Sequence, residues 1–232
     1  MGIKIGVIIP DRNDRPLFLA NCLRMIESQT VKPDIIELVN DPTPDHIPSD
    51  KPDITWRYRT GYERLRDKGL DCILFMENDD WYAQDFIENM TRNWHIYGRP
   101  NIFGTNYTIY YHIMLRKYDK LDHFRRSSAM STLIKPDLTI NWGDDVNPYT
   151  DSWLWSRCKL GGITFTPSKH ICIGIKHGVG MAGGRYHTDE FTISGIKKSG
   201  DFARFKTDDQ HFEFLCSQMD SESYKFYTNY FK

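Results

Sequence analysis

The sequence lacks a long apolar run. None of its hydrophobic stretches approaches the roughly 18 residues that a membrane-spanning helix needs. The stretch IGVIIP near the amino terminus is too short for a signal peptide. Gly6 stands where a myristoylation signal has Ser or Thr. We therefore expect neither a transmembrane segment nor an amino-terminal lipid anchor.

The sequence also lacks an excess of charge of either sign. A formal net charge of −1 over 232 residues gives no electrostatic indication of nucleic-acid or anionic-membrane binding. The five cysteines are odd in number and widely spaced, which is typical of reduced core thiols in a cytoplasmic protein and not of a disulfide framework or a zinc site. Repeats, linkers and low-complexity tracts are missing as well. The sequence therefore predicts one domain over residues 1–232.

The first hundred residues alternate strand and helix patterns. Strands are predicted at IKIGVII (3–9), DIIELV (34–39), ITWRYR (54–59) and CILFM (72–76), and helices at 17–26, 61–69 and 83–98. Short apolar strands that alternate with helices are typical of an α/β fold with a mostly parallel sheet.

After residue 100 the pattern changes. NIFGTNYTIYYHIML (101–115) and SAMSTLIK (128–135) are rich in aromatic and β-branched residues, which favours antiparallel strands. A polar loop (136–150), a helix from about Asp151, a strand in HICIGIKHG, a glycine-rich loop and a helical carboxyl terminus are expected to follow. Residues 1–100 and 101–232 thus differ in their predicted secondary structure within the one predicted domain.

Acidic residues follow the predicted strands. In an open parallel sheet, ligands bind beyond the carboxyl ends of the strands, and polar clusters stand there at 11–14, 40–41 and 77–80. Three carboxyl groups among Glu77, Asn78, Asp79 and Asp80 would repel one another. A Mg²⁺ or Mn²⁺ ion, which takes carboxylate and phosphate oxygens, would relieve that repulsion. The alternative is that one carboxylate caps the next helix and the others face water, since acidic loops are common.

Three stretches in this order resemble glycosyltransferase family 2 proteins of the GT-A fold: IGVIIPDRNDRPLFLANCLRMIESQT, IIELVNDPTPD and GLDCILFMENDDWYAQDFIENM. The family has a strand ending in Pro, a helix with a CL..I..QT pattern, a strand ending in an acidic turn, and an apolar strand ending in a DxD-type motif. The resemblance covers about the first 100 residues. It implies a Rossmann-like GT-A domain, a nucleotide-diphosphate sugar as donor, a divalent metal on its diphosphate, and sugar transfer to a hydroxyl group.

The resemblance also implies residue roles. Glu77 and Asp79 match the acidic positions of the DxD motif, with Glu77 in place of the usual Asp, and Asp79 is expected to bind the metal. Asp80 serves the metal or the donor ribose. Further implied donor contacts are those of Pro10, Asp11 and Arg12 in the loop around the base, Asp41 at the base or ribose, and Arg59 as the nearest match to the family's Arg before the DxD strand.

TDSWLWSRCKLGG resembles the family's ED..L..R....G pattern, in which the Asp is the catalytic base of inverting enzymes. Asp151 takes that position, while Thr150 replaces the usual Glu. Asp151 could instead be a helix N-cap, and Asp144 and Asp145 compete for the role of base. An inverting mechanism is favoured, and a retaining one stays open.

KHGVGMAGG contains a G-x-G-x-x-G pattern (Gly178, Gly180, Gly183), but the apolar helical period that a dinucleotide site requires does not follow it. We interpret it as a loop that closes over the diphosphate, with Lys176 or Arg185 at the phosphates. His177 matches the place where several GT-A enzymes have a metal-binding His, and a structural histidine is the alternative.

The sequence thus predicts a metal-dependent glycosyltransferase. A glycan, a lipid-linked glycan, a protein and a modified nucleic acid are all open as acceptors, and so is the oligomeric state. A nucleotidyltransferase is disfavoured, because the first loop, PDRNDRP, has no glycine for a triphosphate. A non-catalytic nucleotide-sugar binding protein remains the other alternative.

Overall fold

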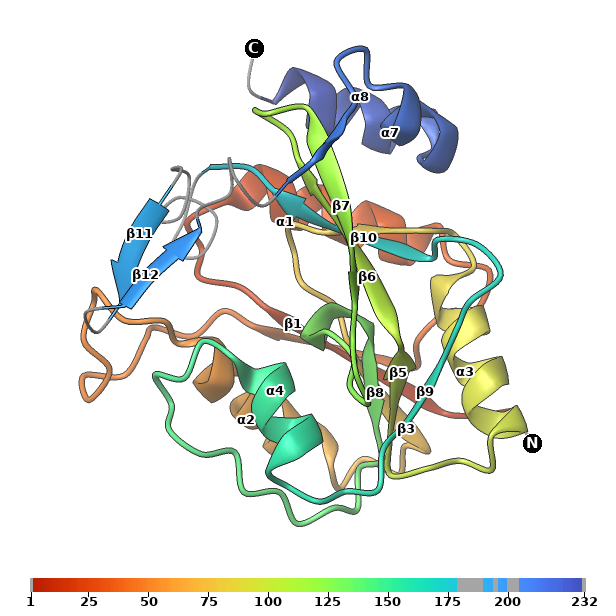
Figure 1. Cartoon of the computed structure of the whole chain (residues 1–232). Coiled ribbons are helices and arrows are strands. Elements are labelled where there is room, and N and C mark those ends of the chain that lie inside the picture. Colours follow the sequence, from red (N-terminus) through yellow and green to blue (C-terminus); the bar gives the residue numbers. More distant parts are fainter. Residues whose placement is uncertain (1, 179–189, 194–195, 200–204, 231–232) are drawn as a thin grey trace. The chain divides into compact units, whose positions relative to one another are not determined.

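The computed structural model describes residues 2–178, 190–193, 196–199 and 205–230 (Figure 1). The chain forms two compact units. The first contains residues 1–108 and 122–172, and the second contains residues 109–121 and 173–232. Each unit is described by itself.

The first unit is built on a six-stranded sheet in the order β2-β1-β3-β8-β5-β9. Its strands are β1 (Ile5–Pro10), β2 (Ile35–Val39), β3 (Cys72–Phe75), β5 (Ile102–Thr105), β8 (Thr132–Ile134) and β9 (Ile163–Phe165). β1 is parallel to both β2 and β3, and β5 is parallel to β9, whereas β8 is antiparallel to its neighbours β3 and β5. The short strand β4 (Trp81–Tyr82) and the 3₁₀ helix η1 (Ala129–Ser131) also belong to this unit.

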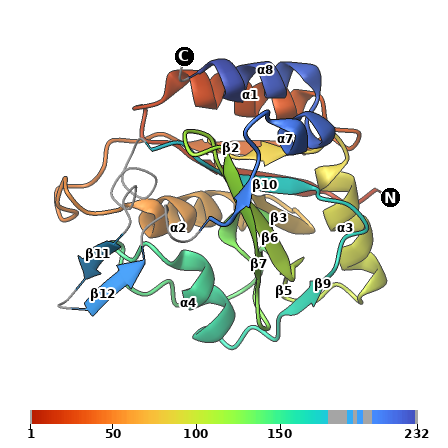
Figure 2. The same cartoon turned by 45° about the horizontal axis from the view of Figure 1, so that its top comes forward.

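Helices cover both faces of the parallel part of this sheet. Every residue of β1 and of β3 is buried, as expected for strands covered on both sides. α1 (Pro16–Glu27) and α2 (Ile54–Leu65) lie on opposite sides of β1 (Figures 1 and 2). α3 (Phe86–Ile96) and the short α4 (Thr150–Ser156) complete the helices of the first unit.

The strand predicted at 54–59 is wrong, because these residues begin helix α2. The buried residues of α2 include Thr55, Tyr58, Tyr62 and Leu65, which recur at the three- and four-residue spacing of a helix face. Gly61 faces the sheet, since a Cβ there would lie 2.6 Å from Ile8 Cγ2. The helix can approach β1 closely because this residue has no side chain.

A core packs between α2 and the sheet. Tyr58 stacks on Phe75 of β3 with ring centroids 4.3 Å apart. Trp142, from the polar loop before α4, packs against Tyr62 and Phe75. The hydroxyl of Tyr62 donates to Pro136 O at 2.8 Å and accepts from Leu138 N–H at 2.9 Å, which fixes this loop to α2.

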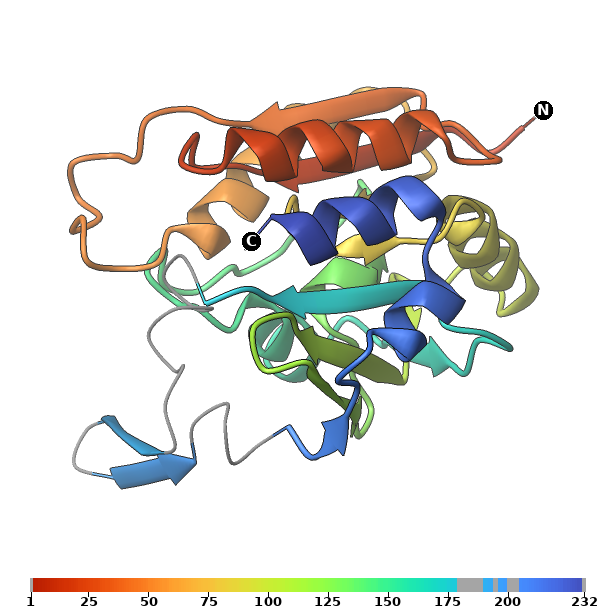
Figure 3. The same ribbon diagram turned by 90° about the horizontal axis from the view of Figure 1, so that it is seen from above.

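The second unit has a smaller mixed sheet. It contains β13 (Thr207–Asp208) and most of β6 (Tyr107–His112), β7 (Lys117–Asp122) and β10 (Cys172–Lys176), whose end residues 107, 108, 122 and 172 belong to the first unit. β6 and β10 are parallel, and β13 is antiparallel to β7. β11 (Glu190–Ile193) and β12 (Ile196–Ser199) form a separate antiparallel pair (Figure 3). Helices α7 (Glu213–Gln218) and α8 (Ser221–Asn229) follow, and Asp220 caps α8 by accepting from the N–H groups of Glu222 and Ser223.

These elements confirm the predicted α/β class, with a main sheet whose first strands are parallel and a smaller second sheet. The antiparallel strands expected after residue 100 are found where β8 pairs with β5 and β13 with β7, whereas β5 with β9 and β6 with β10 are parallel pairs. Among the described residues, no helix combines the length and the apolar character that crossing a membrane requires.

Candidate functional site

The acidic residues 77–80 lie where β3 ends at the carboxyl edge of the parallel strands. Met76 N–H donates to Ile8 O at 3.0 Å, so the pairing with β1 extends one residue beyond β3 before the chain turns. Glu77 N–H donates to the hydroxyl of the buried Tyr82 at 2.7 Å, which holds the turn in place. The turn is therefore fixed at both ends by buried structure.

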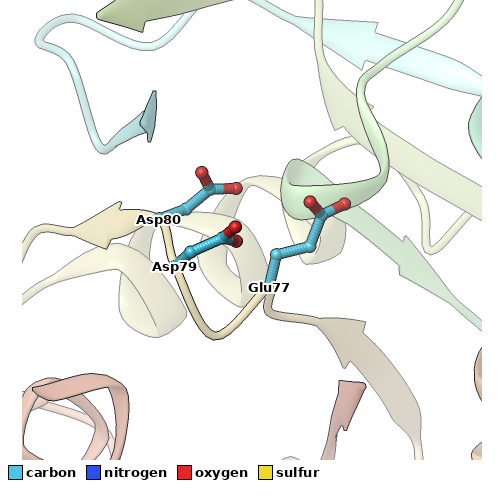
Figure 4. A group of neighbouring side chains, drawn as sticks. All are labelled: Glu77, Asp79 and Asp80. Atoms are coloured by element: carbon cyan, nitrogen blue, oxygen red, sulfur yellow. The ribbon is translucent and has the colours of Figure 1, made fainter. Parts of the chain in front are cut away.

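The three carboxylates of this turn converge. Glu77, Asp79 and Asp80 each offer an oxygen, and these oxygens all lie within 4.8 Å of one another. The three side chains project to the same side of the loop between β3 and β4 (Figure 4). We call Glu77, Asp79 and Asp80 the acidic cluster. An all-oxygen set of this size fits Mg²⁺ or Mn²⁺, which bind one or two carboxylates together with substrate phosphates.

Neighbouring groups experience the negative charge of the acidic cluster. Burial, together with the Glu77 and Asp80 carboxylates, raises the pKa of Tyr58 well above its usual value near 10, and Tyr58 donates to Glu77 Oε1 at 3.3 Å. Burial and the same two carboxylates also raise the pKa of Tyr82. Burial, followed by the charges of Asp79, Asp80 and Asp11, raises the pKa of the Cys22 thiol. Both tyrosine hydroxyls thus stay protonated near the carboxylates.

The loop after β1 is joined to the turn after β3. Asp11 is almost completely buried, and its Oδ1 accepts from Asn78 Nδ2 at 2.6 Å. Asp11 N–H donates to Val39 O at 3.0 Å, which continues the pairing that ends with Pro10 opposite Val39. Arg12 is directed towards Asp53, with Nε 3.8 Å from Oδ1. Of the predicted donor residues, Pro10 and Asp11 are therefore brought to the same sheet edge as the acidic cluster.

The loop after β2 is held by Arg57. This buried guanidinium donates to Val39 O at 2.9 Å, to Asp41 O at 3.2 Å and to the Asp53 carboxylate at 2.8 Å. The Asp41 side chain pairs instead with Arg64, whose hydrogen bond lowers the pKa of Asp41. The loop that carries Asp41 thus has a fixed backbone.

Arg59, two residues after Arg57, donates to Asp145 Oδ2 at 2.8 Å. The same oxygen lies 2.9 Å from His46 Nε2. Arg59 therefore binds the polar loop before α4. The sequence pattern indicated Arg59 and missed Arg57, Arg15 and Tyr58. The spacing of a helix face was the signal that could have placed Arg57 and Tyr58 beside the sheet.

Asp151 lies in the first turn of α4. The N-cap position belongs to Tyr149, so Asp151 does not cap this helix. The carboxylate of Asp151 pairs with Arg126 and is largely shielded from solvent. Thr150, at the position of the family's Glu, is buried with its hydroxyl 2.5 Å from that of Thr55 on α2. Among the competitors for the base, Asp145 binds Arg59 and His46, and Asp144 Oδ1 accepts from Val146 N–H at 3.2 Å.

Lys176 and His177 belong to the second unit. Lys176 ends β10 opposite His112, with its ammonium 5.3 Å from the centre of the Tyr110 ring. His177 is buried. Gly178 adopts a positive φ of 74°, which glycine tolerates without strain. The rest of the glycine-rich loop, with Gly180, Gly183 and Arg185, lies outside the described residues.

No protein-family model and no curated protein matches the chain. Among solved structures, the chain is similar to S. aureus TarS, with 11% identity over 75% of this chain and 37% of TarS at a TM-score of 0.47. It is also similar to residues 1–349 of S. aureus TarS in complex with UDP-GlcNAc, with 11% identity over 75% of this chain and 59% of that one (TM-score 0.46). A third similar structure is a glycosyltransferase involved in glycosylation of the major capsid of PBCV-1, with 9% identity, coverage of 71% and 82%, and a TM-score of 0.39. The matched part is thus less than two thirds of either TarS chain.

Proposed function

We propose that this chain is a metal-dependent glycosyltransferase of the GT-A fold, which moves a sugar from a nucleotide-diphosphate sugar to an acceptor hydroxyl. The observation that carries the proposal is the convergence of Glu77, Asp79 and Asp80 at the carboxyl edge of β3. This is the edge at which open α/β sheets bind their ligands. The resemblance of the first 100 residues to glycosyltransferase family 2 supports the same function.

In this proposal, different residues of the chain bind the metal, the nucleoside and the phosphates. The acidic cluster holds a divalent cation, which when bound neutralises charge on the diphosphate leaving group. Asp11 and the backbone after β2 form the side of the site that receives the nucleoside, because Asp11 hydrogen-bonds Asn78 in the turn that carries the cluster and Val39 at the end of β2. The sequence alone supports the roles proposed for Lys176, at the phosphates, and for His177, at the metal, and both residues belong to the second unit. Asp80 binds either the metal or the donor ribose.

Asp151 is the proposed base that accepts the proton of the acceptor hydroxyl. The ion pair with Arg126 holds the Asp151 carboxylate in one orientation. With Asp151 as the base, the proposed transfer is inverting, because one carboxylate activates the acceptor, and a retaining mechanism is the alternative.

The proposal is tested by thermal unfolding with a panel of nucleotide sugars, including UDP-GlcNAc, each with Mn²⁺ and with a chelator. A true donor at about 100 times its Kd stabilises the folded state by about 2.7 kcal/mol, which corresponds to a rise of about 5–10 °C in Tm. The rise is expected only with the metal. If neither nucleotide sugars nor nucleoside diphosphates change the Tm in Mn²⁺, the proposal is wrong.

Turnover separates an enzyme from a binding protein. Glycosyltransferases hydrolyse their donor slowly when water takes the place of the acceptor, so release of the nucleoside diphosphate in Mn²⁺ supports transfer. A donor that stabilises the protein and stays intact over a day would support the non-catalytic alternative instead.

A further inference from the structure

The guanidinium of Arg15 occupies a position beside the acidic cluster. It pairs with the Asp79 carboxylate, lies 3.4 Å from Asp14 Oδ1 and 3.4 Å from Asn78 Oδ1, and packs over the Phe18 ring. Only 17% of its side chain is exposed. A cation that is mostly removed from water therefore neutralises part of the charge at the end of β3.

The backbone of Arg15 belongs to the start of α1. Arg15 is the N-cap residue, and its carbonyl accepts from the N–H groups of Phe18 and Leu19. Ser, Thr, Asp and Asn are preferred at an N-cap, and positive charge is disfavoured near a helix amino terminus. This side chain makes no capping hydrogen bond and instead pairs with Asp79 in the turn after β3. Local helix chemistry does not explain an Arg here, whereas the acidic cluster does.

The net formal charge of the acidic cluster and Arg15 together equals the charge that a divalent cation would neutralise. Glu77, Asp79 and Asp80 bring three negative charges, and Arg15 brings one positive charge. A divalent cation next to Asp79 would lie close to the guanidinium, and like charges a few ångströms apart in a partly buried site repel strongly. Tight metal binding thus requires that Arg15 leave Asp79. An incoming diphosphate supplies the alternative partner, because the planar guanidinium matches phosphate oxygens well.

We propose that Arg15 is an internal counter-ion of the acidic cluster, which competes with the divalent cation for Asp79 and transfers to the donor diphosphate when metal and donor bind together. The proposal rests on the proposed function for the identity of the donor. This exchange makes metal and nucleotide binding mutually favourable. The diphosphate takes Arg15 away from Asp79, and the metal at Asp79 releases Arg15 for the diphosphate. Metal alone binds weakly to this site, and the nucleotide diphosphate tightens it.

The test is a Mn²⁺ titration followed by the EPR signal of free Mn²⁺, with and without UDP, on the wild type, Arg15→Gln and Arg24→Gln. Arg24 is on the same helix, and its guanidinium hydrogen-bonds Asn21, so its variant removes the same charge away from the cluster. Without UDP, Arg15→Gln is expected to bind Mn²⁺ at least about tenfold more tightly than the wild type. UDP should tighten Mn²⁺ binding at least about tenfold in the wild type and in Arg24→Gln, and less than threefold in Arg15→Gln.

Arg15→Lys keeps the charge and covers the case that the Gln variant folds poorly. It is expected to bind Mn²⁺ alone within about threefold of the wild type. Equal or weaker Mn²⁺ binding by Arg15→Gln, or tightening by UDP that is unchanged in that variant, overturns the role of Arg15 while the proposed function stands. If neither the wild type nor Arg15→Gln binds Mn²⁺ at all, both proposals are wrong.

Discussion

The carboxylate of Asp79 is the group on which the proposed metal site depends most. Asp79→Asn keeps the shape of the side chain and removes one charge from the acidic cluster. The affinity for divalent metals follows the number of charged ligands, so we expect Mn²⁺ binding in the presence of UDP to weaken by about 100-fold. Equilibrium dialysis against Mn²⁺ measures it. Asp67→Asn, at a side chain that is 91% exposed, is the matched control. Equal losses in both variants would contradict a site at Asp79.

Asp151 should act on transfer and not on donor binding. Asp151→Asn removes the proposed proton acceptor, so we expect at least about a 100-fold lower rate of sugar transfer with an unchanged Kd for the donor. Transfer is measured with the acceptor that the donor screen leads to, and donor binding by calorimetry. Asp144→Asn, in the loop before α4, is the control and should keep its activity. A variant that loses donor binding together with transfer would refute this division of roles.

The sequence predicted some residues of the site and not others, for a physical reason. Glu77, Asp79 and Asp80 follow an apolar strand, and the carboxyl end of a parallel strand marks the edge of the sheet where ligands bind. Arg15 was missed because its contact with Asp79 joins residues 64 apart in the chain. Such a contact depends on how α1 packs and leaves no local pattern. The contact of Arg126 with Asp151 is of the same kind.

The strand wrongly predicted at the start of helix α2 also affected which arginine was assigned to the site. Within residues 54–59, positions 56–59 alternate aromatic and basic side chains, which favours a strand when the segment is considered alone. In a strand Arg57 and Arg59 would share a face, whereas in a helix they are about 200° apart. Arg57 consequently points to the loop after β2 and Arg59 to Asp145. Arg59, the residue that was matched to the family's Arg, therefore does not face the loop after β2.

The close packing of α2 on the sheet provides a test at the level of elements. In Gly61→Ala the new Cβ would lie 2.6 Å from Ile8 Cγ2 and 3.0 Å from Val39 Cγ2. Overpacking of this kind costs about 1–3 kcal/mol, which exceeds the gain of about 1 kcal/mol from higher helix propensity. Urea unfolding should therefore show a lower free energy of unfolding. The control Glu63→Ala, on the exposed side of the same helix, should change it by less than about 0.5 kcal/mol. A more stable Gly61→Ala would mean that α2 does not pack this closely.

The stability of the whole molecule should fall at high pH. Burial and the acidic cluster raise the pKa of Tyr58 and of Tyr82 in the folded state, whereas in the unfolded chain both ionise near pH 10. Their contribution is therefore complete below about pH 10 and is lost as the pH rises above it. Each such tyrosine adds a slope of up to about −1.4 kcal/mol per pH unit there.

Urea unfolding between pH 8 and 11.5 measures this effect, with Tyr58→Phe as the comparison. The variant lacks the ionisable hydroxyl, so its free energy of unfolding should fall less steeply than that of the wild type above pH 10. Parallel curves for the two proteins would show that Tyr58 ionises alike in the folded and unfolded chain, which would contradict its place beside Glu77.

The central claim is that Glu77, Asp79 and Asp80 bind a divalent cation that carries a nucleotide diphosphate. The most direct measurement is anomalous diffraction at the manganese edge from crystals grown with Mn²⁺ and UDP or a donor from the screen. We expect a manganese peak within bonding distance of at least two of the three carboxylates, with diphosphate oxygens completing its ligands. Bound nucleotide without such a peak, or manganese bound elsewhere at saturating concentration, would contradict it.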